Sequence, residues 1–219
     1  IFAMTKPELG LKGISAFILE KDMKGFTVGP KEKKMGIRGS ATCELIFDKV
    51  KVLKENLLGK EGDGFKIAMK TLNGGRIGIA AQALGIAEGA FERALKYVKT
   101  RKQFGKAIAD FQHTQFKIAD MKTEIEAARG LLYKAVFDLE NNLDYSESAA
   151  MAKLYASKVA VKIADDAIQL MGGYGYIRDY EVERYLRDAK ITEIYEGTSE
   201  VQRMVIAGKV MKSWILSYS

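Results

Sequence analysis

Glu196 and the three residues after it are the group in this sequence whose types and spacing best suit chemistry. The carboxylate of Glu196 directly precedes Gly197 and the hydroxyl residues Thr198 and Ser199. A glycine lets the backbone turn and lets a ligand approach closely, and a hydroxyl can cap the helix that follows. Because a helix N-terminus attracts anions, a general base beside a phosphorylated or acyl ligand would fit here.

The same four residues also have a purely structural interpretation. Residues 200–206 have helical spacing, so the stretch is also typical of a capped helix start with a solvated glutamate. Capping signatures are common, and on local grounds alone this second interpretation is favoured. The elements around the stretch have to decide between the two.

The composition narrows the classes of site. The single cysteine, Cys43, excludes an internal disulfide and a zinc site with several cysteines. The single histidine, His113, argues against a Ser-His-Asp site and a multi-histidine metal site. We therefore expect no metal.

The charge and hydropathy patterns narrow the classes of partner. The net charge of +7 is spread among acidic residues, which is typical of a solvated surface and suits an anionic ligand. Binding of nucleic acid would need clustered basic residues with stacking or base-reading groups. No apolar run approaches the length that spans a membrane. We therefore expect neither a nucleic acid nor a membrane as partner.

The hydrophobic pattern predicts a mainly α fold. With only 2 prolines, long helices can run uninterrupted. Helical periodicity predicts long helices over residues 65–100, 111–141 and 146–171, a short one near 180–187, and a last one from 199 to about 214. Several long antiparallel helices with short joints indicate a C-terminal four-helix bundle.

Residues 1–58 are predicted to contribute only part of a β domain. Residues 14–19 and 43–47 carry β-branched and aromatic side chains between glycine-containing turns. So few strands cannot close a barrel and would leave unpaired edges. We expect residues 1–58 to be the second half of a middle β domain and residues 59–219 to be a helical bundle domain.

Five segments decide how Glu196 is interpreted. In chain order they read GIRGS at 36–40, GGRIGIA at 74–80, RKQFG at 101–105, QLMGGYG at 169–175 and YEGTSE at 195–200. Together, and over nearly the whole chain, they resemble the acyl-CoA dehydrogenase family, most closely its short-chain (butyryl-CoA) members. Proteins of that family have an N-terminal helical domain, a middle β domain and a C-terminal helical bundle, so this chain would begin inside the middle domain.

The resemblance implies an activity. It implies FAD-dependent α,β-dehydrogenation of a short-chain acyl-CoA, with Glu196 removing the α proton while a hydride goes to FAD. Some relatives carry the base on an earlier helix, at the position of Gly75, which has no side chain to serve. The resemblance also implies an electron-transfer flavoprotein as partner, a homotetramer, and a location in the bacterial cytoplasm or, in a eukaryote, the mitochondrial matrix.

The resemblance further implies roles for individual residues. Those expected at FAD are Arg101, Phe104, Gln112, Gln169, Gly172, Gly173, Thr198, Ser199 and Glu200. Those expected at the acyl-CoA are Asn73, Arg76, Tyr195 and Gly197. Most short-chain relatives carry Asp where Asn73 stands. Compared with Asp, Asn lacks the negative charge and adds a hydrogen-bond donor. Judged locally, the two arginines are ordinary helix residues, the glycines form a helix C-cap, and Tyr195 is a core aromatic.

Two other classes of function stay open. The first is a non-catalytic helical-bundle fragment that serves assembly or cofactor binding and is inactive without the N-terminal half. The second, a nucleic-acid-binding bundle, has only the net charge in its favour. The presence of Glu196 favours the enzyme, because a scaffold would not need that base.

Overall fold

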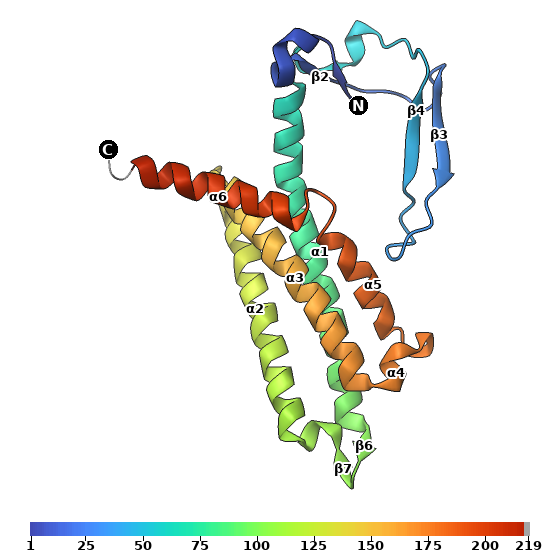
Figure 1. Cartoon of the computed structure of the whole chain (residues 1–219), viewed down its shortest axis with the longest axis vertical. Helices are drawn as coiled ribbons and strands as arrows, with labels where there is room; N and C mark the ends of the chain where they lie inside the picture. Colours follow the sequence, from blue (N-terminus) through green and yellow to red (C-terminus); the bar gives the residue numbers. More distant parts are fainter. Residues whose placement is uncertain (217–219) are drawn as a thin grey trace. The chain divides into compact units, whose positions relative to one another are not determined.

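The computed structural model describes the backbone of residues 1–216 and the side chains of residues 1–212. It separates into two compact units, the first made of residues 1–34 and 38–72, the second of residues 35–37 and those from 73 onward. The expected mainly α fold, with a helical bundle after a β-containing part, is confirmed (Figure 1). The domain boundary expected at residues 58 and 59 stays a prediction.

The first unit contains short antiparallel strands. Strands β1 (Phe2–Met4), β2 (Ile14–Phe17) and β5 (Leu57–Leu58) pair in the order β1-β2-β5, and β3 (Phe26–Lys31) pairs with β4 (Cys43–Phe47). Two 3₁₀ helices, Pro7–Gly13 and Lys54–Asn56, join them. Strand β3 escaped the sequence analysis because it contains Gly29 and Pro30, which normally mark a turn.

The second unit is built from helices. They are α1 (Gly64–Thr100, whose residues from 73 belong here), α2 (Gln112–Glu140), α3 (Ser146–Met171), α4 (Gly173–Tyr176), α5 (Val182–Thr192) and α6 (Ser199–Leu216). A small hairpin, β6 (Lys102–Gln103) with β7 (Lys106–Ala107), and the 3₁₀ helix Ile108–Asp110 connect α1 to α2. Helix α3 lies beside α2 and also contacts α5 and α6 (Figure 1).

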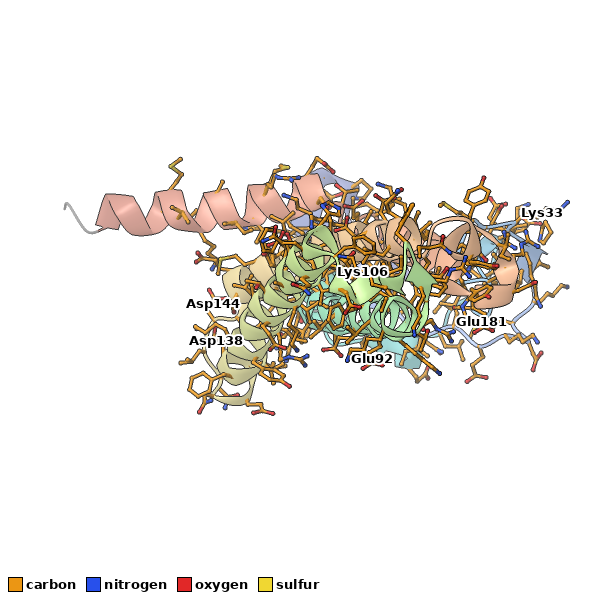
Figure 2. All side chains as sticks on the ribbon, turned by 90° about the horizontal axis from the view of Figure 1, so that it is seen from below. Lys33, Glu92, Lys106, Asp138, Asp144 and Glu181 are labelled. Atoms are coloured by element: carbon orange, nitrogen blue, oxygen red, sulfur yellow. The ribbon has the colours of Figure 1, made fainter. Side chains whose placement is uncertain are left out.

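Small side chains form the centre of this unit. Fully buried alanines line α1 (Ala80, Ala83, Ala87, Ala90, Ala94) and α3 (Ala149, Ala152, Ala156, Ala160, Ala164, Ala167). The apolar face expected on α2 supplies Met121, Ile125, Ala128 and Leu132 to the same core, with Ile118 packed against it. Charged side chains of both signs are exposed on this unit, and Figure 2 labels Glu92 on α1, Lys106 on β7, and Asp144 and Glu181 in connecting segments.

The segment that leads into the predicted base differs from the expectation. A 3₁₀ helix, Arg178–Tyr180, comes first, and α5 then runs from Val182 to Thr192 instead of ending near residue 187. Glu181 separates the two, because its left-handed φ of 57° cannot continue a helix. The longer α5 ends just before Glu196. Trp214, expected near the end of α6, has its side chain outside the described part of the chain.

Candidate active site

The segment between α5 and α6 turns sharply at the predicted base. Glu196 has a φ of 54° and Gly197 a φ of 89°, so two consecutive residues are left-handed. For a residue with a side chain, this conformation costs about 1–2 kcal/mol. The Thr198 hydroxyl accepts the Val201 N–H at 3.4 Å, which is a long version of the expected helix cap. A strained residue held in one place is typical of functional sites.

The Glu196 carboxylate lies against α1 at Gly75. A Cβ built on Gly75 would stand 2.5 Å from Glu196 Oε2 and 2.9 Å from Cδ, closer than a real carbon can come. Only glycine therefore leaves room for the carboxylate in this position. Gly75, which has no side chain to act as a base, thus makes space for the carboxylate of the predicted base, Glu196.

Arg76 follows Gly75 and is 5% exposed. Its Nη1 donates to Asn73 Oδ1 at 2.7 Å, whereas its buried Nε has no hydrogen-bond partner among the described residues. Burial lowers the pKa of Arg76, and the negative charge of Glu196 opposes that shift. The structure therefore brings Asn73, Arg76 and Glu196 together, and the Arg76 Nε stays without a partner among the described residues.

Tyr195 joins the turn to the same helix. Its hydroxyl donates to Gln82 Oε1 on α1, and burial raises the pKa of the phenol. Gln82 was not singled out from the sequence. Tyr195 is therefore a half-buried polar contact beside Glu196 and more than a core aromatic.

Two further residues that the sequence analysis missed bind the backbone of the turn. Lys153, on α3, donates from Nζ to the Gly197 carbonyl at 2.5 Å. Gln202, on α6, donates from Nε2 to the same carbonyl at 2.8 Å and to the Glu196 carbonyl at 3.3 Å. Lys153 did carry a signal, because it lies four residues after Ala149, on the alanine face that enters the core. Gln202 carried none.

A second group of predicted residues surrounds a pocket at the other end of α3. Arg101, Gln169, Gly172 and Gly173 line this pocket of about 480 Å³, together with Tyr97 and Tyr174 among others. The Arg101 guanidinium lies 5.5 Å from the centroid of the Tyr174 ring. A Cβ at either glycine would meet no atom within 4 Å, so the backbone there is open.

The remaining predicted residues lie elsewhere. Thr198, Ser199 and Glu200 line a separate hollow of about 360 Å³ with Lys158, Lys190 and Arg203 among its other residues. Phe104 is 91% exposed and meets the Phe111 ring edge-on, and Gln112 is exposed at the start of α2. The residues expected at one cofactor therefore fall into two hollows and two exposed positions.

The described residues contain no cluster of three or more His, Cys, Asp or Glu side chains that could hold a metal ion. Among the helices of the described part of the chain, none is both long and apolar enough to cross a membrane.

Comparison with known proteins shows which family the chain is similar to. The family model described as "Acyl-CoA dehydrogenase, C-terminal domain" matches residues 62–211, and the one described as "Acyl-CoA dehydrogenase, middle domain" matches residues 1–50. The chain belongs to the acyl-CoA dehydrogenase family. The resemblance carried by the five sequence segments is thereby confirmed.

Individual relatives give the same result over most of this chain. The short-chain specific acyl-CoA dehydrogenase of Clostridium acetobutylicum is 59% identical over 212 residues, covering 97% of this chain and 56% of that protein. Butyryl-CoA dehydrogenase from Megasphaera elsdenii has a solved structure that matches with a TM-score of 0.94 and 57% identity, over 96% of this chain and 55% of its own.

A further solved structure is described as "Electron transferring flavoprotein of Acidaminococcus fermentans: Towards a mechanism of flavin-based electron bifurcation". It contains a chain that matches with a TM-score of 0.95 and 60% identity, over 96% of this chain and 55% of that chain. The present chain thus spans about half the length of the relatives it matches.

Proposed function

We propose that the protein catalyses FAD-dependent α,β-dehydrogenation of short-chain acyl-CoA thioesters, with Glu196 as the base. The observation that carries this proposal is the left-handed turn that holds the Glu196 carboxylate over the bare backbone of Gly75. Membership of the family supports the reaction class, and the short-chain relatives support the substrate class.

The reaction breaks two C–H bonds of the acyl group. Glu196 takes the α proton, the electron pair of that bond forms the Cα=Cβ double bond, and a hydride leaves the β carbon. Bound FAD supplies the acceptor for that hydride. Negative charge develops on the thioester oxygen meanwhile, and preorganised donors stabilise such charge strongly. We assign the backbone N–H of Glu196 to this role.

The substrate side is formed by Asn73, Arg76, Tyr195 and Gly197. The buried Nε of Arg76, which lacks a hydrogen-bond partner among the described residues, can donate to a polar group of the acyl-CoA. The Asn73 side chain orients the same guanidinium through its bond to Nη1. Asn73 thus supplies an acceptor here even though it lacks the negative charge of Asp.

The residues expected at FAD fit a diphosphate-containing cofactor. Arginine forks and open glycine backbone are the donors that phosphate oxygens take, and the pocket at Arg101 combines Arg101, Gln169, Gly172 and Gly173. Thr198, Ser199 and Glu200 would contact FAD from their own hollow. We place Phe104 and Gln112 against FAD held by a neighbouring subunit, since a ring that is 91% exposed indicates a partner surface.

Assembly and electron transfer form part of the same proposal. Large apolar side chains are exposed on α2 (Phe116, Phe137) and on α6 (Met204, Met211), as expected for helices that pack in a homotetramer. The flavoprotein named with the matching Acidaminococcus chain supports an electron-transfer flavoprotein as acceptor. The cytoplasm or the mitochondrial matrix remains the predicted location.

A substitution at Glu196 tests the base. In the complete protein, Glu196→Gln removes the proton acceptor and keeps the size of the side chain. We expect dehydrogenation of butyryl-CoA to fall at least about 10³-fold, with FAD content and acyl-CoA affinity retained. Bleaching of the flavin absorption after anaerobic mixing with butyryl-CoA measures the rate. Glu140→Gln, at the exposed end of α2, is the control, and retained turnover in Glu196→Gln would remove Glu196 as base.

A spectrum of this chain with added FAD separates the enzyme from the assembly fragment. Bound flavin that bleaches on anaerobic addition of butyryl-CoA would show that residues 1–219 suffice for the chemistry. Failure to bind flavin, or binding without bleaching, would support a fragment whose chemistry needs the rest of the protein.

A further inference from the structure

The Glu196–Gly197 turn is held by side chains that come from two other helices. The Gly197 carbonyl receives two donors, Lys153 Nζ at 2.5 Å and Gln202 Nε2 at 2.8 Å. Lys153 is 44 residues away in sequence and lies on α3, whereas Gln202 lies in the first turns of α6. The two hydrogen bonds therefore connect the Gly197 carbonyl to both α3 and α6.

Lys153 is placed where a lysine is unfavourable. It is 0% exposed and is the largest fully buried side chain of the described residues. A buried ammonium costs several kcal/mol unless its protons find acceptors and its charge finds partners. Around it lie the positive Arg76 and the negative Glu193, Glu196 and Glu200. Apolar packing would stabilise the helix at least as well, so this buried charge points to a role in geometry more than in stability.

Gln202 closes the same turn from the other side. A Cβ built on Gly197 would lie 2.9 Å from Gln202 Nε2, so the amide sits directly on the glycine backbone. The amide also reaches the Glu196 carbonyl at 3.3 Å. Because the two carbonyls belong to the two left-handed residues, these bonds stabilise the backbone conformation that Glu196 alone would avoid.

We propose that Lys153 and Gln202 are positioning residues that lock the Glu196–Gly197 turn left-handed and thereby aim the Glu196 carboxylate over Gly75. This inference rests on the proposed function, in which Glu196 is the base. The carboxylate direction follows from the backbone, since φ of Glu196 sets where its Cβ points. Loss of either donor leaves the base present and misaligned.

The test uses the complete protein and separates proton abstraction from hydride transfer. Lys153→Met and Gln202→Leu each remove a donor while keeping much of the buried volume. Exchange of α protons into D₂O is followed by NMR on (methylthio)acetyl-CoA, whose sulfur replaces the β carbon so that no hydride can leave. Displacement of a catalytic group by about 1 Å can cost about 10²-fold in rate. We expect each variant to lose about tenfold and the pair together about 10²-fold, with unchanged KM and flavin content.

A matched control identifies a merely structural effect. Ser157, one turn after Lys153 on α3, is also buried, and its hydroxyl is shared between the Lys153 and Thr192 carbonyls. Ser157→Ala should lower the thermal midpoint and leave the exchange rate intact. Wild-type exchange in Lys153→Met, or a loss that Ser157→Ala reproduces at equal destabilisation, would overturn the positioning role.

The outcome for Glu196→Gln in the same exchange assay separates this inference from the proposed function. If that variant still exchanges α protons, Glu196 is not the base and both proposals fail. If it loses exchange while Lys153→Met and Gln202→Leu keep it, only the positioning role fails. Loss in all three supports both.

Discussion

The Glu196 turn and the Arg101 pocket differ in how the protein holds its polar groups. At the turn, buried Lys153 and Gln202 bind the backbone, and Arg76 is only 5% exposed. At the pocket, the predicted Arg101, Gly172 and Gly173 are exposed, and open space surrounds both glycines. Both regions belong to the helical unit and both are contacted by α3.

This difference indicates that the turn and the pocket control different steps, the rate and the binding of a ligand. Hydrogen bonds within the chain hold the turn, so its geometry depends on the protein's own side chains. The pocket presents donors whose partners have to come from a ligand or another subunit. Substitutions at the turn should therefore change rates and spare binding, whereas substitutions at the pocket should change binding and spare the rate of the saturated enzyme.

Gly75→Ala is expected to show the largest effect of this kind. The added methyl would stand 2.5 Å from Glu196 Oε2, and since the carboxylate is the end of a flexible side chain it would be displaced, leaving the helix intact. We expect kcat for butyryl-CoA to fall about 10²-fold, with FAD content unchanged. Stopped-flow bleaching of the flavin measures the rate.

Gly74→Ala is the control for that experiment, because a Cβ at Gly74 meets no atom within 4 Å. It carries the same gain in helix propensity without touching the carboxylate. Equal rates for the two alanine variants would show that the position of the carboxylate over Gly75 has no bearing on catalysis. The claim that the turn controls the rate would then fail.

Arg101→Ala should have a smaller effect, and on a different quantity. Because Arg101 is exposed and its guanidinium stacks on the Tyr174 ring, its loss should leave stability nearly unchanged. A charge-assisted hydrogen bond contributes about 1.5–3 kcal/mol, so we expect the dissociation constant for FAD to rise about 10- to 100-fold. Fluorescence titration of the apoprotein measures it.

Arg101→Lys keeps the charge and loses the planar fork. It should recover part of the affinity and leave kcat at saturating FAD as in the wild type. A fall in kcat that persists at saturation would place Arg101 in the chemistry and would remove the proposed separation between the two regions.

The sequence was sufficient for the three long helices and for the family, and insufficient for the bonds that shape the turn. The α2 face was predictable because Met121, Ile125, Ala128 and Leu132 repeat with helical spacing. The predicted bounds of α5 were wrong because Glu181 adopts a left-handed conformation that local propensity disfavours. Such a residue is held by tertiary structure, and no window of the sequence reports it.

For the site, the motif located Glu196 but not its support. Lys153 reaches Gly197 across 44 positions, and such a distance in sequence leaves no local pattern beyond a lysine on an alanine face. The end of α3 at Gly172 was predictable, because a glycine commonly follows the last residue of a helix. The roles of the individual residues at FAD and at the acyl-CoA stay predictions.

The smallest expected effect is a pH dependence of stability that only the buried region should show. Burial and the positive charge of Arg76 lower the pKa of Lys153 to about 8, against the opposing charges of Glu193, Glu196 and Glu200. In the unfolded chain the amine titrates near its ordinary value of about 10.4. Between these two values the unfolded state binds more protons, so stability rises with pH over that range.

The difference between wild type and Lys153→Met isolates this contribution, because every other titrating group is shared. From pH 8 to pH 10 the free energy of unfolding of the wild type should gain on that of the variant, by on the order of 1 kcal/mol. Urea unfolding at fixed FAD saturation measures it. A difference that stays flat would give Lys153 an ordinary pKa, and one that falls with pH would mean that the surrounding carboxylates stabilise the ammonium more than burial destabilises it. In the same measurement on wild type and Arg101→Lys, whose added amine is exposed, the difference in free energy of unfolding should not change with pH. A change as large as that found for Lys153→Met would end the contrast between the two regions.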